Sequence, residues 1–131
     1  MISKSELLSI PSKARQLERD KEHYEILREK AYSVPSTTYG RERVQNTVEN
    51  RSHIYADAAI DLAKEIRAEQ AELDELKDAA REWISTLDTR NRRMMTYRYI
   101  DCQTWDMTAC LMGYTERHTR RLARRITAEL A

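Results

Sequence analysis

Residues that interrupt helices or build disulfide frameworks are scarce in this chain of 131 residues, which has two Gly, two Pro, two Cys and no Phe. Two cysteines eight positions apart, Cys102 and Cys110, are too few for a disulfide scaffold, so we expect reduced thiols. No apolar run approaches the roughly 20 residues that span a membrane, and no signal-peptide pattern opens the chain. We therefore expect a cytoplasmic protein without a membrane partner.

The motifs of common catalytic and metal sites are also missing. Gly40 and Gly113 lie too far apart to form a phosphate-cradling loop. The three histidines have no Cys, His or carboxylate at metal-ligand spacing, and the acidic pairs fall on an exposed helix face. The sequence thus predicts no enzyme, no cofactor and no metal site.

What remains is typical of long helices, with 40% hydrophobic and 34% charged residues. The predicted fold class is all-α: a long antiparallel coiled-coil hairpin followed by a C-terminal three-helix unit. A first helix is expected over 12–33, with Pro11 in or before its first turn, where the ring is tolerated. Apolar residues recur there every seven positions, at Ile10, Leu17, Tyr24 and Ala31. Pro35 ends the pattern, and a connection over 34–53 follows.

A second, longer helix is predicted over 54–87. Its expected seam alternates in steps of four and three: Tyr55, Ala59, Leu62, Ile66, Glu69, Leu73, Leu76, Ala80, Trp83 and Leu87. Such spacing indicates a coiled coil, in which the polar Glu69 can fix the register. The first helix is too short to cover this seam, so we expect a homodimer. An intramolecular bundle with the C-terminal unit folded back is the alternative.

Charge divides the chain into two predicted domains, an oligomerisation hairpin over 1–87 and a C-terminal domain over 88–131. Residues 1–87 carry 14 basic and 17 acidic side chains, whereas residues 88–131 carry nine basic and five acidic ones. All nine basic residues of the second domain are arginines, and the planar guanidinium suits phosphate and guanine edges. A solvated helix face rich in arginine is the alternative explanation.

The C-terminal domain has the outline of a helix-turn-helix. We expect helices over 90–102, 104–112 and 115–130. Ala109 is small enough for two helices to approach, Gly113 can take the left-handed backbone of a tight turn, and Thr115 can cap the next helix. The stripe Thr119, Leu122, Ile126 and Leu130 is expected to face the core. Trp83 and Trp105 are expected to be core anchors.

Three segments of this domain, Tyr97-Arg-Tyr-Ile-Asp, Thr104-Trp-Asp and Gly113-Tyr-Thr, together with Ala109, resemble region four of bacterial sigma factors. The whole chain is similar to small phage-encoded proteins of this type, the ArpU-like late transcription regulators. Glu42-Arg-Val-Gln also resembles a short motif that such proteins carry between their helices.

The chain departs from the family pattern at several positions. Cys102 stands where relatives usually carry glycine, and Gln103 replaces an apolar residue. Thr108 and Thr119 replace β-branched aliphatic residues, and we expect their hydroxyls to bond to the preceding turn. Met107, Cys110 and Leu111 form an expected apolar spot, which is either plain surface or a contact with a partner such as RNA polymerase.

The resemblance implies a sequence-specific regulator of phage or prophage genes that binds double-stranded DNA as a dimer. It implies base readers at Glu116, Arg117, Arg120 and Arg121, and phosphate contacts at Arg124, Arg125, Arg92 and Arg93; His118 can serve either role or lie in solvent. Two alternatives stay open at this point: a DNA-packaging accessory protein similar to a small terminase subunit, and an adaptor that docks on RNA polymerase without binding DNA.

Overall fold

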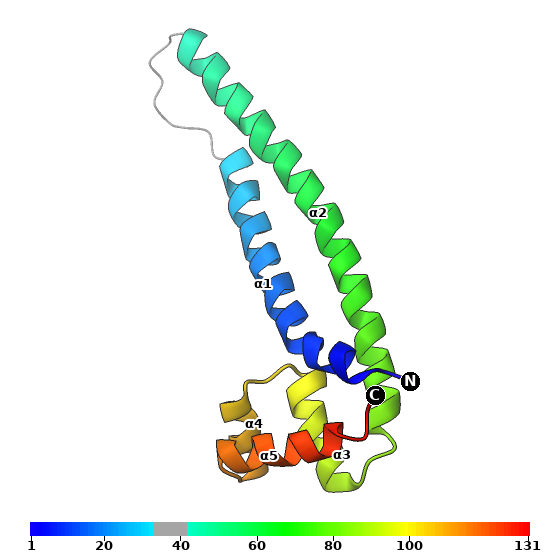
Figure 1. Cartoon of the computed structure of the whole chain (residues 1–131). Coiled ribbons are helices and arrows are strands. Elements are labelled where there is room, and N and C mark those ends of the chain that lie inside the picture. The colour runs from blue at the N-terminus through cyan, green and yellow to red at the C-terminus, as the bar shows by residue number, and fades with distance from the viewer. Residues whose placement is uncertain (33–41) are drawn as a thin grey trace. The chain divides into compact units, whose positions relative to one another are not determined.

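A computed structural model describes the backbone of residues 1–32 and 42–131 and the side chains of 1–32 and 51–131. The described residues form only helices, which confirms the all-α prediction. In chain order they are α1 (Lys4–Tyr32), α2 (Glu42–Ile84), α3 (Thr89–Met95), the π-helix η1 (Thr96–Ile100), α4 (Trp105–Met112) and α5 (Glu116–Thr127). The long helices α1 and α2 pack together (Figure 1). None of the described helices has the length and apolar character needed to cross a membrane.

Helix α1 begins at Lys4, eight residues before the expected start. Ser3 caps it by accepting a hydrogen bond from the backbone N–H of Glu6 at 3.2 Å, and its hydroxyl donates to the Glu6 carboxylate at 3.0 Å. This Ser-x-x-Glu pattern is the usual capping signal and explains why the helix begins before Pro11. The placement of Pro11 in a first turn was therefore wrong, because Pro11 lies inside α1. Figure 1 shows α1 bending near its N-terminal end, as a proline inside a helix causes.

Helix α2 begins at Glu42, so the expected connection over 34–53 was too long by twelve residues. Val34, Pro35 and Gly40 lie outside the described residues, and so do the side chains of the Glu42-Arg-Val-Gln motif. What the sequence predicts for them therefore stays a prediction. Helix α2 ends at Ile84, three residues before the expected end, so Leu87 lies beyond it. The burial expected of the seam positions is confirmed: Ala59, Leu73, Ala80 and Trp83 are buried, and the other six are half-buried.

The contacts within the chain define two compact units. We call residues 16–70 the hairpin unit, and residues 1–15 with 71–131 the arginine-rich unit. In the hairpin unit α1 runs antiparallel to α2 (Figure 1). Near the C-terminal end of α1, the Ser52 hydroxyl donates to the carbonyl of Ala31 at 2.6 Å, and Lys30 lies over the ring of Tyr55. The predicted domain boundary at residue 87 stays a prediction.

The core of the arginine-rich unit is built from all of its helices. Ile2, Leu7 and Ile10 are buried, and so are Trp83, Ile84, Met94, Met95, Tyr99, Ala109, Ala123, Ile126 and Leu130. The backbone N–H of Lys4 donates to the carbonyl of Ala131 at 2.9 Å, so the two ends of the chain meet here. The N-terminal residues, which the sequence reading assigned to the hairpin, thereby help to hold the C-terminal helices in place.

Candidate nucleic-acid interface

Helices α4 and α5 are joined by the short connection Gly113–Thr115. Gly113 has φ 73° and ψ 28°, the left-handed conformation that ends a helix without a Cβ penalty. Thr115 then caps α5, because its hydroxyl accepts a hydrogen bond from the N–H of His118 at 3.2 Å. Ala109 is 3% exposed, as expected for a small residue between close helices. The predicted roles of these three residues are confirmed.

The segment before α4 positions it from the other side. The predicted helix over 90–102 is instead the pair α3 and η1, and it ends at Ile100. Cys102 follows with φ 54°, a left-handed conformation that side chains with a Cβ adopt at a cost. Thr104 then caps α4 by accepting from the N–H of Met107 at 3.1 Å. Cys102 thus adopts a backbone conformation that favours glycine, at the position where the resembled family usually has glycine.

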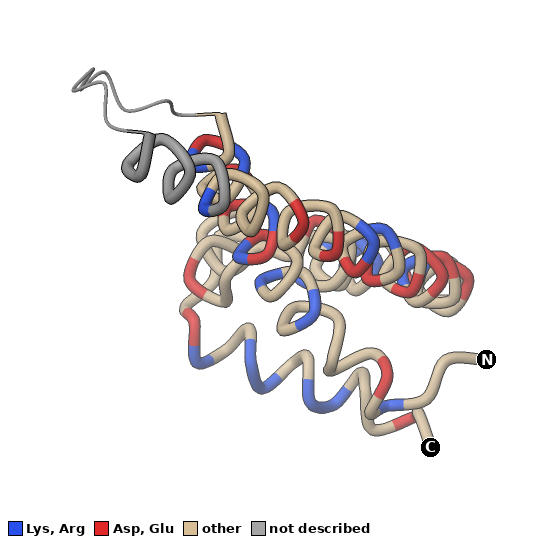
Figure 2. Tube along the Cα trace, turned by 90° about the horizontal axis from the view of Figure 1, so that it is seen from above, with Lys and Arg blue, Asp and Glu red and all other residues tan. Residues whose placement is uncertain are grey.

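Helix α5 separates its arginines from its apolar side. Thr119, Ala123, Ile126 and Thr127 are buried, and Leu122 is half-buried. Arg117, Arg121 and Arg124 are exposed and share one face by their spacing of four and three residues, with Arg125 exposed beside them. Figure 2 shows basic positions recurring along α5 as the chain runs toward its C-terminus. Helix α5 ends at Thr127, three residues earlier than expected, but Leu130 is still buried as predicted.

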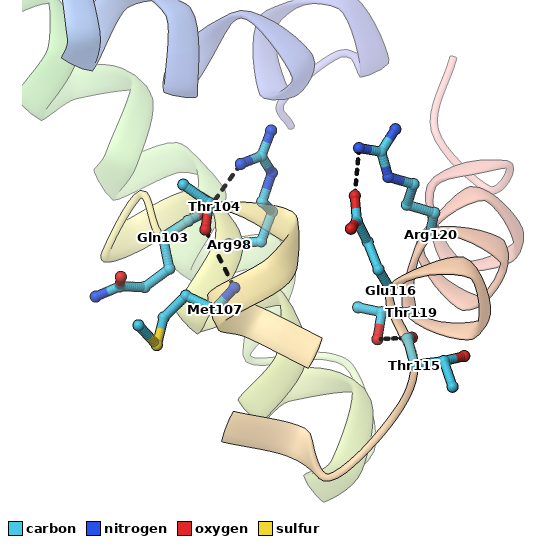
Figure 3. Close-up of polar contacts among 8 residues, drawn as sticks. All are labelled: Arg98, Gln103, Thr104, Met107, Thr115, Glu116, Thr119 and Arg120. Atoms are coloured by element: carbon cyan, nitrogen blue, oxygen red, sulfur yellow. Dashed lines mark hydrogen bonds and ion pairs between the residues drawn. The ribbon is translucent and has the colours of Figure 1, made fainter. Parts of the chain in front are cut away.

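Arg120 differs from its neighbours because the protein holds its guanidinium. It donates a hydrogen bond to the Glu116 carboxylate at 2.6 Å, one turn earlier on α5 (Figure 3). It also lies 5.7 Å from the centroid of the Trp105 ring, which belongs to α4. Half of the Arg120 side chain remains exposed. Two of the predicted base readers, Glu116 and Arg120, are therefore joined in one ion pair.

Arg98 on η1 also lies beside the Trp105 ring, and it is not among the DNA contacts predicted from the sequence. Its guanidinium donates to the carbonyl of Gln103 at 2.8 Å (Figure 3) and lies 4.4 Å from the centroid of the Trp105 ring. Burial lowers the pKa of Arg98 below its ordinary value, and the nearby charges of Arg15 and Arg120 act in the same direction. Trp105, expected as a core anchor, is half-buried and serves as a platform for two arginines. In the sequence, only the aromatic character of Trp105 could have suggested that it contacts arginines.

The remaining predicted DNA contacts lie on α5 and α3. The ring of His118 is exposed and packs edge-on against Tyr114, with 5.0 Å between ring centroids. Arg92 and Arg93 are exposed on α3, and the guanidinium of Arg92 donates to the carbonyl of Leu87 at 3.1 Å. The structure thus brings the predicted α5 residues onto one helix and leaves Arg92 and Arg93 on another.

Two threonines of this unit that stand at aliphatic positions behave differently. The Thr119 hydroxyl donates to the carbonyl of Thr115 at 2.9 Å, as predicted. The Thr108 hydroxyl was predicted to bond in the same way, and this was wrong: it is buried without a hydrogen-bond partner among the described residues. The expected apolar spot is exposed, since Met107, Cys110 and Leu111 all lie on the outer side of α4.

No family model, curated protein or solved structure matches the chain. The geometry of the arginine-rich unit and the motifs of its sequence are therefore the features that point to a function.

Proposed function

We propose that the chain is a sequence-specific DNA-binding regulator of phage or prophage genes, which binds duplex DNA through α5 and acts as a homodimer. The observation that carries this proposal is the division of α5 into a buried apolar side and an exposed side with Arg117, Arg121, Arg124 and Arg125. A capped helix after a tight turn, with a cationic outer face, has the form that enters a major groove.

Each residue then has a role set by its position. Arg117, Arg121 and the more constrained Arg120 lie in the first two turns of α5, where side chains reach base edges. Arg124 and Arg125, one turn later, are placed for backbone phosphates, and so are Arg92 and Arg93 on α3. The resemblance to sigma-factor region four and to the ArpU-like regulators supports the assignment to phage genes.

The experiment is a selection of genomic fragments with the purified protein, followed by binding measurements on the selected site at several salt concentrations. We expect a saturable complex whose affinity falls steeply with added salt, because phosphate contacts release counterions. Arg121→Ala is expected to weaken binding and to leave the unfolding midpoint unchanged.

Arg19→Ala is the matched control, because Arg19 is an exposed arginine of the hairpin unit and lies outside the proposed interface. Equal DNA affinities for Arg121→Ala, Arg19→Ala and the unchanged protein would exclude α5 from the interface. Enrichment of no fragment, together with binding to purified RNA polymerase, would favour an adaptor instead.

A further inference from the structure

The hairpin unit contains an open groove of about 860 Å³ between α1 and α2. Residues between 24 and 32 form one wall, and residues between 52 and 67 form the other. Ala56, Ala59 and Ala63 line its α2 side, together with Ile60. At the usual rise of about 1.5 Å per residue, the α2 wall is about 22 Å long, enough for four turns of a docked helix.

The helices of this unit bury few side chains against each other. Among its described residues only Leu17 and Ala59 are buried. Ile60, which lines the groove, is 56% exposed. Helices gain most of their stability by packing an apolar face, so Ile60 marks apolar surface of α2 that the described residues of one chain leave uncovered.

The charges beside the groove are arranged so that two α2 helices complement each other. Asp57 and Asp61 precede Lys64 and Arg67 on the same helix, and none of the four forms an ion pair with a described residue. Two copies of this segment in antiparallel orientation place Asp57 and Asp61 of each beside Arg67 and Lys64 of the other. In parallel orientation like charges would meet instead, which disfavours that pairing.

We propose that a second copy of this chain occupies the groove, with α2 packed antiparallel on α2 about a two-fold axis close to Leu62. The small side chains Ala56 and Ala63 allow the close approach, and Ile60 of each copy covers the alanines of the other. Such an interface is isologous, because the same patch contributes on both sides. The inference builds on the proposed function, for which it specifies how the dimer forms.

The test is the mass in solution, measured by sedimentation without DNA over a range of protein concentrations. The unchanged protein is expected to be a dimer. Lys64→Glu and Asp57→Lys are each expected to raise the dimer dissociation constant by about tenfold or more, because each disrupts two symmetry-related contacts. The double variant Asp57→Lys/Arg67→Glu is expected to recover the dimer, since it exchanges the two charges of one facing pair. Arg19→Glu is the control, an exposed charge reversal on α1 away from the groove.

A monomer at all concentrations, a larger ring, or a dimer that both single variants leave intact would overturn the proposal. The helix content and unfolding midpoint of every variant are measured alongside. If Lys64→Glu does not fold, Asp57→Lys and Arg67→Glu test the same contacts independently. DNA binding is measured separately, so a failure of the proposed dimer does not contradict the proposed DNA binding. A protein that dimerises as proposed but binds no DNA would contradict only the proposed function.

Discussion

Arg120 on α5 lies over the ring of Trp105 on α4, with 5.7 Å between the guanidinium carbon and the ring centroid. The same guanidinium pairs with Glu116 at 2.6 Å. The contact with Trp105 joins the two helices on either side of the Gly113 turn. Arg120 therefore has a structural role in addition to the role we propose for it in DNA binding, whereas Arg121 makes no ion pair with a described residue.

Replacing the two arginines separately is expected to distinguish these roles. Arg120→Ala should lower the free energy of unfolding by about 1 kcal/mol, because a half-exposed ion pair contributes up to about 0.5 kcal/mol and the cation–π contact a similar amount. Arg121→Ala should leave it unchanged, while both variants weaken DNA binding. Chemical denaturation monitored by circular dichroism measures the difference. Equal stability of the two variants would show that neither the Trp105 contact nor the Glu116 ion pair stabilises the protein in solution.

Thr108→Val is expected to stabilise the protein by about 1 kcal/mol. The Thr108 hydroxyl is buried without a partner among the described residues, and a methyl group of similar size removes the cost of burying it. Thr119→Val is the matched control, because the Thr119 hydroxyl donates to the carbonyl of Thr115 at 2.9 Å. That variant should lose about 0.5–1 kcal/mol. The comparison uses denaturant midpoints, and a loss of stability in Thr108→Val would mean that its hydroxyl has a partner in solution.

Stability is expected to decrease in alkaline solution because of Tyr99. Burial raises the pKa of its phenol above the ordinary value of 10.0, although Arg98 opposes this shift. Above pH 10 the unfolded chain has lost the Tyr99 proton while the folded chain retains it, so unfolding releases a proton and its free energy falls as pH rises. Burial also raises the pKa of Cys102 above 9.0, which starts the same decrease at a lower pH.

Tyr99→Phe is expected to reduce this alkaline decrease and to leave the part caused by Cys102. Tyr114→Phe, which removes a half-buried phenol from the α4–α5 connection, is the control. Thermal unfolding between pH 7 and 11 provides the measurement. Parallel pH profiles of Tyr99→Phe and the unchanged protein would exclude Tyr99 as a source of the effect.

The sequence predicted the parts of the fold that depend on local chemistry. Gly113 and Thr115 were assigned correctly because a left-handed turn and a helix cap each depend on one residue and its immediate neighbours. The long seam was likewise predictable, since its period directly indicates which side of a helix is buried.

Contacts between distant segments were not predictable in this way. The docking of residues 1–11 on the C-terminal helices joins Lys4 to Ala131, and no periodicity in the sequence reports such a pairing. The cluster of Arg98, Arg120 and Trp105 was missed for the same reason, because its members come from three helices. Helix starts were wrong where a capping residue was overlooked, as at Ser3.

Cys102→Gly is expected to stabilise the protein by about 1 kcal/mol. Cys102 has φ 54°, where a residue with a Cβ pays about 1–2 kcal/mol and glycine does not, although glycine also gives the unfolded chain more freedom. Cys102→Ala is the matched control, since it removes the thiol but keeps the Cβ and the strained backbone. It should therefore gain nothing, and the difference between the two variants isolates the backbone term. Denaturant titration under reducing conditions measures both, and equal stability of the two variants would show that the left-handed conformation carries no cost in solution.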